Sequence, residues 1–446
     1  MLLFQEFFVT LQTEQNSRKI MKEYRPRIAD VLLEERLDAF GAVLVEGAKA
    51  CGKSTTAMQQ AKSVLKMDDP KERLHYLELA NSDINILLNG ETPRLIDEWQ
   101  LAPKFWDAIR YTVDMRGEEG QFILTGSAVP AKSDAKDEMT HTGTGRYARL
   151  RMRPMSLWES GESNGGISLE DLFSGKKGLH AENILSLEQV AFLTCRGGWP
   201  NALGKKTERA SLLQAKEYAK SIAESDISRV DGVERNPDRA LGVMRSYARN
   251  IGSQASISTI AADISGNEGV EISEKTIISY INALRQIFVI EDSKAWNPNL
   301  RSKTAIRTTD TRYFVDPSVG AAAMGLSPND LINDTNTFGF FFENLAVRDL
   351  RVYAELLDGK VEHYRDKNNL ECDTVIRLPN GKYGLIEVKL GSDQGIKEGV
   401  EALTTLSELL DMKNPPAFRA VLTATGSYAY QREDGIYIIP IGCLRP

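Results

Sequence analysis

Apolar positions in the first third of the chain alternate between helical spacing and short continuous runs. Ile28, Val31 and Leu32 are three and four residues apart, which predicts a helix that begins after Tyr24. The runs 42–45 (AVLV) and 121–124 (QFIL) each predict a buried strand. Strands that alternate with helical segments are typical of an α/β domain built on a parallel sheet.

Two more segments between these runs have strand-like patterns. Residues 74–79 (LHYLEL) and 93–98 (PRLIDE) are each predicted as a strand, and the second ends in two acids, Asp97 and Glu98. These segments add two strands to the expected sheet.

The pattern becomes helical over residues 205–295. Two short helices, a turn and a helix rich in Ser and Thr follow one another, which is the signature of a helix-turn-helix or winged-helix module, with residues 288–290 starting the wing. The helical segments are predicted at 211–230, 241–248, 258–263 and 273–284.

The last of these helices supports two interpretations. Lys275, Thr276 and Ser279 could face a DNA groove, or the module could be a structural element between domains. Because the helix carries one lysine and acids flank it (Glu271 and Glu274), the structural interpretation is favoured.

The last third returns to a mixture of helix and strand patterns. A helix is predicted over 338–353, and strands over 361–365, 370–376 and 383–389. Asn380-Gly381, the preferred dipeptide of a type I′ hairpin turn, separates the last two strands. A second α/β unit is therefore expected at this end.

Length and composition set limits on this picture. At 446 residues the chain is too long for one ordinary core, so roughly two to four domains are expected. The chain is 42% hydrophobic and 26% charged, and no apolar run could span a bilayer. Residues 1–23 are expected to be a leader without the features of a signal peptide. These properties predict a cytoplasmic protein with no membrane partner.

Cysteine, histidine and charge exclude further classes of protein. The four cysteines and four histidines are scattered without metal-ligand spacing, which predicts free thiols in a reducing compartment and no zinc site. The net charge is −7 and the pI is near 5.5, so any nucleic-acid site must be a local basic patch.

The residues after the first apolar run carry the most specific motif of the chain. Residues 47–54 (GAKACGKS) match the phosphate-binding pattern G-x4-G-K-[ST], and a helical segment follows. Gly47 and Gly52 let the backbone approach an anion closely, and the helix N-terminus attracts phosphate. Lys53 would reach the β- and γ-phosphates of ATP, and the Ser54 hydroxyl would bind Mg²⁺. A Gly-rich turn with an incidental lysine is the alternative.

Polar side chains at the ends of two later strands could complete this site. Asp97 is expected to hold Mg²⁺ and Glu98 to polarise the attacking water, although two acids at a strand end can also be a solvated cap. Residues 125–127 (TGS) could sense the γ-phosphate or form an ordinary turn. The expected nucleotide-binding residues are Gly47, Ala48, Lys49, Ala50, Cys51, Gly52, Lys53, Ser54, Thr55 and Ser127.

Charged side chains also converge in the last third. Side chains alternate faces along a strand, so Glu387 and Lys389 share one face, and the hairpin can bring Asp373 opposite them. Glu343 lies in the first turn of the preceding helix. Two carboxylates and a lysine can hold Mg²⁺ and orient a water, with Asp373 and Glu387 as metal ligands. The Glu-x-Lys pair alone would be weak support, since charged pairs on exposed strands are common.

Four motifs carry a resemblance to a known family. They are GAKACGKST, RLIDEWQLAP, FILTGS and GRYARLRMRPMSLWE, and they resemble the AAA-like ATPases that have a C-terminal DUF4143 domain. The family's loop usually begins G-P-R-Q-x-G-K-T-T. Ala48, Lys49 and Ala50 replace Pro, Arg and Gln here, and Ser54 replaces the first Thr, whereas the phosphate-contacting positions are kept. The resemblance implies an ATPase domain that uses ATP and Mg²⁺.

Two other elements match the same family. Arg146, in its G-R element, could act as an arginine finger on a neighbouring copy of the chain, or could be a surface salt-bridging residue. Residues 196–200 (RGGWP) match its GG-aromatic-P turn, for which we expect no catalytic role.

The charged cluster of the last third resembles the PD-(D/E)XK nuclease fold. In that pattern a helix acid precedes an Asp, and Glu-x-Lys follows on the next strand. Glu343, Asp373, Glu387 and Lys389 occur in this order. The resemblance implies a restriction-endonuclease-like domain with DNA as its partner, and such a domain can also keep these residues as a binding module that does not cut.

The expected fold class is α/β, with an AAA-like P-loop domain, a helical winged-helix-like middle and a restriction-endonuclease-like end. After the leader, the expected parts are 24–160, a linker over 161–204, 205–300 and 301–446. The leading hypothesis is Mg-ATP hydrolysis coupled to a nuclease-like domain that acts on DNA, in a chain that could form a homo-oligomer. The alternative is a nucleotide-switched scaffold or regulator that binds a partner without cleavage. The expected catalytic residues are Lys53, Glu98, Arg146, Glu343, Asp373, Glu387 and Lys389.

Overall fold

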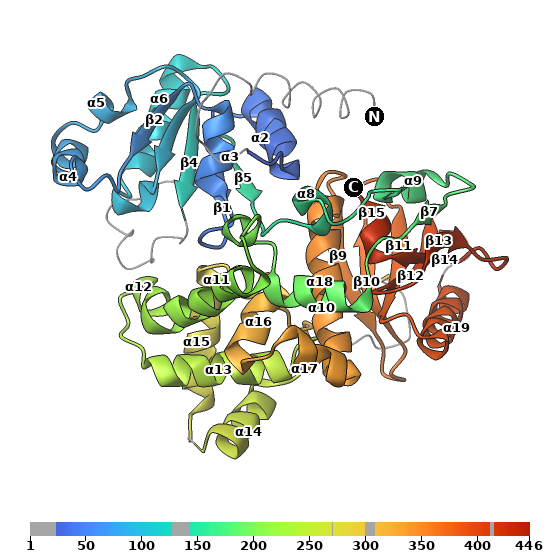
Figure 1. The fold of residues 1–446 in the computed structure, drawn as a ribbon. Coiled ribbons are helices and arrows are strands. Elements are labelled where there is room, and N and C mark those ends of the chain that lie inside the picture. The colour runs from blue at the N-terminus through green and yellow to red at the C-terminus, as the bar shows by residue number, and fades with distance from the viewer. Residues whose placement is uncertain (1–23, 127–141, 270, 299–307, 411–413) are drawn as a thin grey trace.

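A computed structural model describes residues 24–126, 142–269, 271–298, 308–410 and 414–446. The chain forms a parallel-sheet part, a helical part and a mixed-sheet part that meet around a central junction (Figure 1). The predicted leader, 1–23, lies outside the described residues. Among the described helices, none combines the length and apolar character needed to cross a membrane.

The N-terminal part is a five-stranded parallel sheet of order β2-β3-β4-β1-β5. Apolar runs build its centre, since every residue of β4 is buried. The predicted α/β class is confirmed. The strands are β1 (Ala42–Glu46), β2 (Ser63–Lys66), β3 (Arg94–Asp97), β4 (Phe122–Gly126) and β5 (Tyr147–Arg151). The helices are α2 (Ile28–Ala39), α3 (Lys53–Gln60), α4 (Arg73–Ser82), α5 (Asn85–Leu88), η2 (Trp99–Leu101) and α6 (Phe105–Arg116).

One strand prediction in this part is wrong. Residues 74–79 lie in helix α4, where Leu74 is 78% exposed, and the outer strand of the sheet is β2 instead. Edge strands need few apolar residues because one side is open, and in β2 only Leu65 is buried. Strand β2 therefore lacks the apolar run that predicts a strand, whereas residues 74–79 have a strand-like pattern although they form a helix.

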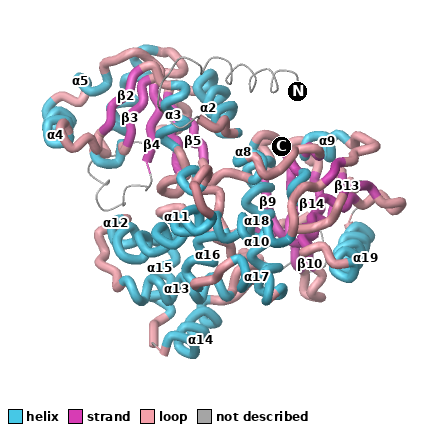
Figure 2. Tube along the Cα trace, viewed as in Figure 1, coloured by secondary structure: helices cyan, strands magenta, loops and turns pink. Residues whose placement is uncertain are grey.

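The middle part is mainly helical, as predicted (Figure 2). Two helices from residues 317–333 also pack here, against α10, α11 and α13. The elements are α10 (Leu187–Arg196), η3 (Pro200–Ala202), α11 (Glu208–Ser221), a π-helical turn η4 (Ile222–Asp226), α12 (Ile227–Arg229), α13 (Pro237–Arg249), α14 (Ile257–Glu268), α15 (Glu274–Gln286), α16 (Pro317–Met324) and α17 (Pro328–Asn333).

Two of the three candidate DNA-facing residues of α15 have partners within the chain, whereas Lys275 is exposed. The Ser279 hydroxyl accepts a hydrogen bond from Arg235 at 3.2 Å, and Thr276 bonds to the helix-capping residue Ser273. After α15 the chain turns at Phe288, and Ile290 and Ser293 form antiparallel bridges with Phe314 and Thr311. These contacts agree with the structural interpretation of the helix.

The C-terminal part is an eight-stranded mixed sheet of order β7-β13-β14-β12-β11-β10-β9-β8. The predicted hairpin is confirmed, since β10 and β11 are antiparallel. The predicted type I′ turn is wrong, because only Gly381 of the Asn380-Gly381 pair has a left-handed φ, of 84°, and its N–H donates to the Leu378 carbonyl in a three-residue loop. Helix α18 (Thr335–Glu355) packs on β9, β10 and β11, and α19 (Asp393–Leu409) packs on β10, β11 and β12. The strands are β8 (Lys294–Ala295), β9 (Lys360–Arg365), β10 (Glu371–Arg377), β11 (Tyr383–Lys389), β12 (Phe418–Thr423), β13 (Tyr428–Gln431) and β14 (Tyr437–Pro440).

Residues 161–204, expected to be a linker, are folded: 161–182 pack with the C-terminal strands, whereas α10 and η3 lie in the helical part. Strand β6 (Ile167–Ser168) pairs with β15 (Leu444–Arg445), and β7 (Ala181–Glu182) pairs with β13. Helix α9 (Leu169–Ser174) and the turn η5 (Ile441–Cys443) lie beside these pairs.

A buried ionic cluster joins the three parts, and we call it the junction network. Arg348 on α18 contacts Asp316 at 2.9 Å and Asp349 at 2.7 Å, and all three are at most 1% exposed. The second oxygen of Asp349 accepts from the backbone N–H of Leu157 in α8 (Leu157–Ser160). Asp316 accepts from the N–H of Gly198 in the GG-aromatic-P turn. The network also includes Arg27 and Glu159, which form an ion pair at 3.1 Å.

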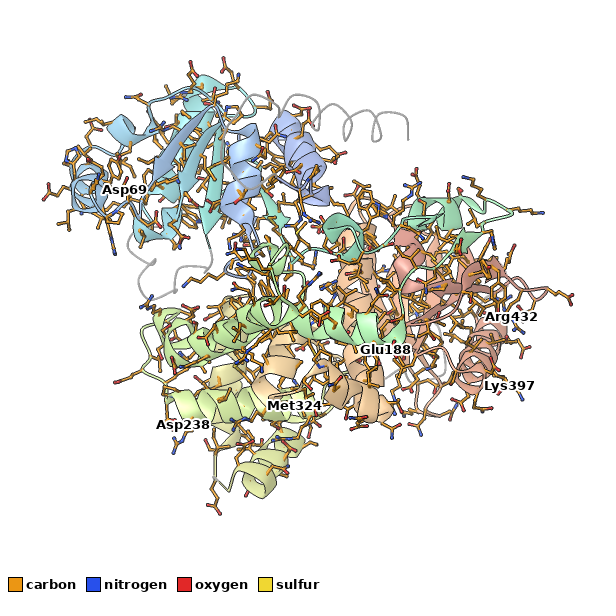
Figure 3. The ribbon with its side chains drawn as sticks, viewed as in Figure 1. Asp69, Glu188, Asp238, Met324, Lys397 and Arg432 are labelled. Carbon is orange, nitrogen blue, oxygen red and sulfur yellow. The ribbon has the colours of Figure 1, made fainter. Side chains whose placement is uncertain are left out.

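We predict that Asp316→Ala strongly destabilises the protein. Removing this carboxylate leaves the Arg348 charge buried with one partner, which costs on the order of 3–5 kcal/mol. Urea denaturation would measure the loss. The control is Lys397→Ala, because Lys397 lies at the periphery on α19 (Figure 3) and its 4.0 Å pair with Glu401 is exposed. The control should cost at most about 0.5 kcal/mol, and equal losses in both variants would contradict the prediction.

Candidate functional site

The glycine-rich loop lies between β1 and α3, at the carboxyl ends of the parallel strands. A Cβ on Gly47 would lie 2.0 Å from the Met152 carbonyl oxygen, so no other residue fits there. Gly52 has a φ of 108°, which favours glycine and directs the following N–H groups into the loop. The loop therefore has the geometry of an anion-binding helix N-terminus.

Three predicted site residues meet beneath this loop. The Ser54 hydroxyl donates to Asp97 Oδ1 at 2.7 Å, and the Thr125 hydroxyl at the end of β4 donates to the same oxygen. The Lys53 ammonium is buried and donates to the carbonyls of Gly47 and Ala48 at 2.9 Å. A hydroxyl and a carboxylate in contact beside a buried lysine form a donor set that fits Mg²⁺ and phosphate.

Glu98 adopts an unusual backbone conformation next to this site. Its φ of 55° lies in the left-handed region, which costs a residue with a Cβ roughly 1–3 kcal/mol. Its carboxylate accepts a hydrogen bond from Gln100, and partial burial raises its pKa. The surrounding structure therefore holds Glu98 in a specific orientation.

Arg146 lies far from the loop in the same chain. Its carbonyl accepts from the N–H of Ala42 at the start of β1, whereas the loop follows the end of β1, roughly 13 Å away along the strand. The half-exposed guanidinium pairs with Asp114 at 2.6 Å. Within one chain Arg146 is thus a surface salt-bridging residue, and a finger role would require a second copy.

The other predicted nucleotide-binding residues differ in their surroundings. Thr55 is exposed on α3, and Ser127 lies outside the described residues. Lys49 is exposed and pairs with Asp226 of η4 at 3.2 Å, so the loop touches the helical part. Ala50 is also exposed and has a left-handed φ of 63°. Cys51 is buried and free, as are the other three cysteines.

Sequence reasoning missed two residues that support the loop from behind. Arg27 donates to the Cys51 carbonyl at 3.0 Å and to the Arg153 carbonyl at 2.8 Å. Glu159 holds the Arg27 side chain and accepts from the N–H groups of Ile28 and Ser156. The junction network thereby reaches the loop.

The predicted residues of the C-terminal part also meet. In the β10–β11 register Thr374 lies opposite Ile386, and one further step brings Asp373 opposite Glu387. Lys389 Nζ lies 2.8 Å from Glu387 and 3.6 Å from Asp373, which also accepts from the N–H of Val388 at 2.8 Å. Although burial opposes its charge, these carboxylates raise the pKa of Lys389.

Glu343 on α18 completes this group, which we call the carboxylate cluster. Burial and the nearby Asp373 raise the pKa of Glu343 well above its ordinary value, and the Tyr313 hydroxyl donates to it. Burial and Asp373 likewise raise the pKa of Glu387 to about 8, and one oxygen of Glu387 lacks a partner among the described residues. Three acids thus surround one lysine, and the raised pKa values favour the protonated forms of Glu343 and Glu387, so a bound cation would have to displace their protons.

The cluster has limits as a metal site. Among the residues that the structure describes, no group of three His, Cys, Asp or Glu side chains is arranged to hold one ion. Asp373 and Glu387 alone could supply two carboxylates, with water completing the shell of a Mg²⁺ ion. The donor chemistry fits Mg²⁺, but the two carboxylates would supply only part of its coordination shell.

Family models match three segments of the chain. Residues 39–160 match an AAA domain, and residues 338–444 match a domain of unknown function, DUF4143. The chain carries an AAA domain and a DUF4143 domain. Between them, residues 187–330 match a second domain of unknown function, DUF8612. None of the curated proteins compared with the chain matches it.

Solved structures show weak similarity over about three quarters of the chain or less. The Walker-type ATPase PABY2304 of Pyrococcus abyssi shares 14% identity at a TM-score of 0.42, over 69% of this chain and 98% of its own. The Aeropyrum pernix ORC2 protein in its ADP form shares 12% identity at a TM-score of 0.30, over 76% of this chain and 98% of its own. Drosophila ORC bound to DNA shares 12% identity at a TM-score of 0.20, over 70% of this chain and 90% of its own. Similarity at this level assigns no function to the chain.

We predict that Glu387→Gln stabilises the DUF4143 domain increasingly as pH rises. The folded Glu387 keeps its proton up to about pH 8, whereas the unfolded chain releases it near pH 4.5, so wild-type stability falls between these values. Glutamine does not titrate. In urea denaturation without divalent cations, the free energy of unfolding of Glu387→Gln should exceed that of the wild type by about 2–4 kcal/mol at pH 8. Glu401→Gln on the exposed face of α19 is the control and should show no such trend. A pH-independent difference for Glu387→Gln would refute the prediction.

Proposed function

We propose that the AAA domain binds and hydrolyses Mg-ATP. The contact between Ser54 and Asp97 at the foot of the glycine-rich loop carries this proposal. Lys53 would exchange its loop carbonyls for the β- and γ-phosphates, and Ser54 and Asp97 would hold Mg²⁺, which offsets phosphate charge. Glu98 would polarise the attacking water. The remaining residues of 47–55, with Ser127, would line the nucleotide.

For the DUF4143 domain the proposal is a restriction-endonuclease-like fold that acts on DNA. Its support is the convergence of Glu343 from a helix with Asp373, Glu387 and Lys389 from a hairpin, which is the order that the PD-(D/E)XK pattern requires. Asp373 and Glu387 would hold Mg²⁺ with its waters, and Lys389 would offset phosphate charge.

Coupling between the two domains is the third part of the proposal. The junction network runs from the Cys51 carbonyl through Arg27, Glu159 and α8 to Asp349. Glu343 lies on the same helix as Asp349, six residues earlier, which corresponds to about 9 Å along the axis. A change at the loop would therefore reach the helix that carries one member of the carboxylate cluster.

The alternative function is a nucleotide-switched scaffold whose DUF4143 domain binds a partner without cleavage. Two observations favour it: the described residues offer no three-ligand metal group, and the chain has a net charge of −7 without a basic track on α15. In both cases the proposed domains are 24–160, 205–300 and 301–446 with a linker over 161–204, in a protein of cytoplasmic location. Helices α10 and α16 would then pack onto the winged-helix-like middle from outside its bounds, with α17 against α10. Arg146 would act only in a homo-oligomer.

The ATPase proposal predicts distinct effects of Lys53→Ala and Glu98→Gln. Lys53→Ala should abolish Mg-ATP binding and turnover, whereas Glu98→Gln should keep binding and lower kcat by about 100-fold or more. Phosphate release and a fluorescent ATP analogue would measure turnover and binding. Lys62→Ala, after α3, is a matched lysine control. If Lys53→Ala turns over ATP at the wild-type rate, the ATPase proposal is wrong.

The nuclease proposal predicts Mg²⁺- or Mn²⁺-dependent nicking of plasmid DNA that Lys389→Ala abolishes. Lys389 supplies the charge that offsets the phosphate, so its loss should lower cleavage by at least about 100-fold. The assay is run with and without ATP, because coupling predicts that nucleotide changes the rate. Lys397→Ala on α19 is the control. If wild-type protein cuts no DNA while it turns over ATP, the scaffold alternative holds instead.

A further inference from the structure

Gln100 is the residue that contacts the proposed catalytic carboxylate. It lies in the short turn η2, two residues after Glu98, and its Nε2 donates to Glu98 Oε2. The other end of the amide, Oε1, is buried and has no hydrogen-bond partner among the described residues. Buried polar atoms are normally paired, so this acceptor calls for a donor.

The position of the Gln100 amide depends on the end of strand β4. A Cβ on Gly126 would lie 2.4 Å from Gln100 Oε1, and 3.2 Å from the indole nitrogen of Trp99. The missing side chain of Gly126 thus leaves the space that the amide fills. Because β3 and β4 are paired with Asp97 opposite Thr125, the amide lies at the strand edge that holds the Ser54–Asp97 contact.

Glu98 needs such a partner because of its backbone. Its left-handed φ of 55° points the half-buried side chain in a direction that an ordinary strand end would not. The Gln100 amide then fixes the rotation of the carboxylate. A carboxylate that must polarise one water benefits from being held in place before the substrate arrives.

We propose that Gln100 is a positioning residue for ATP hydrolysis, which holds the Glu98 carboxylate through Nε2 and offers Oε1 to a donor that arrives with Mg-ATP. A water ordered at the γ-phosphate has the required chemistry, because it can donate to Oε1 and to Glu98 together. This inference rests on the proposed ATPase function and adds a role for Gln100, to which that proposal gives none.

The test is Gln100→Glu in the full chain. Glutamate has the same size, but its carboxylate cannot donate to Glu98 and repels it, so the variant breaks this contact while it keeps the packing. The neutral variant Gln100→Met removes the donor without adding a charge and should lower kcat in the same direction. We expect kcat to fall at least about tenfold while KM and the affinity for a fluorescent ATP analogue change less than about threefold. In a Glu98→Gln background, Gln100→Glu should lower kcat by less than about twofold further, because the two residues act as one unit. Gln59→Glu on the exposed face of α3 is the control.

Other outcomes distinguish a failure of the proposed role of Gln100 from a failure of the proposed ATPase function. A kcat within about twofold of wild type, a change confined to KM, or a full additional loss in the Glu98→Gln background would overturn the role of Gln100 while turnover persists. Absence of turnover in the wild type, or turnover that survives Lys53→Ala, would overturn the ATPase proposal and this role with it. If Gln100→Glu lowers the melting temperature, the neutral variant Gln100→Met replaces it, with the same expected split between kcat and KM.

Discussion

The rest of the structure depends on the burial of one guanidinium. The Arg348 side chain is 1% exposed, and a charge at that depth is tolerated only while carboxylates face it. Asp316 and Asp349 provide them, and each uses its other contacts to hold a distant backbone segment: the turn at Gly198 and the helix at Leu157. The charge requirement therefore fixes the mutual position of α18, the GG-aromatic-P turn and α8. Through Glu159 and Arg27 the same constraint reaches the glycine-rich loop.

The two clusters balance charge in opposite ways. At the loop, Lys53 is already satisfied by two carbonyls, so an arriving phosphate must offer more than those bonds give. In the carboxylate cluster, burial and the neighbouring Asp373 raise the pKa values of Glu343 and Glu387, although Lys389 opposes the shift. The loop thus presents neutral carbonyls to Lys53, whereas the cluster presents carboxylates to Lys389.

Sequence alone located the loop, the hairpin and the members of both clusters, because each depends on local chemistry at fixed spacing. The contact between Ser54 and Asp97 follows from strands whose carboxyl ends meet at one edge, and Gly381 follows from the dihedral angles of its turn. Other features depend on tertiary partners and left no periodic signal. Strand β2 is an exposed edge, Arg27 is one arginine among many, and the unpaired oxygen of Gln100 exists only because Gly126 lies opposite it. Arg146 lies beside the start of β1, and the loop follows the end of that strand. This separation could be recognised only once the order of the strands was known.

The pairing of residues 161–182 with the C-terminal strands has a consequence for how the chain is synthesised. Ser163 bonds to the carbonyl of Leu444 across 281 positions, and β7 waits for β13 across a similar distance. The parallel sheet can form as soon as residue 151 leaves the ribosome, whereas the segment that follows it stays without partners until the final strands emerge. At ordinary elongation rates of about 5–20 residues per second, that interval lasts on the order of tens of seconds. The two-residue strands β6 and β7 therefore gain their partners only at the end of synthesis.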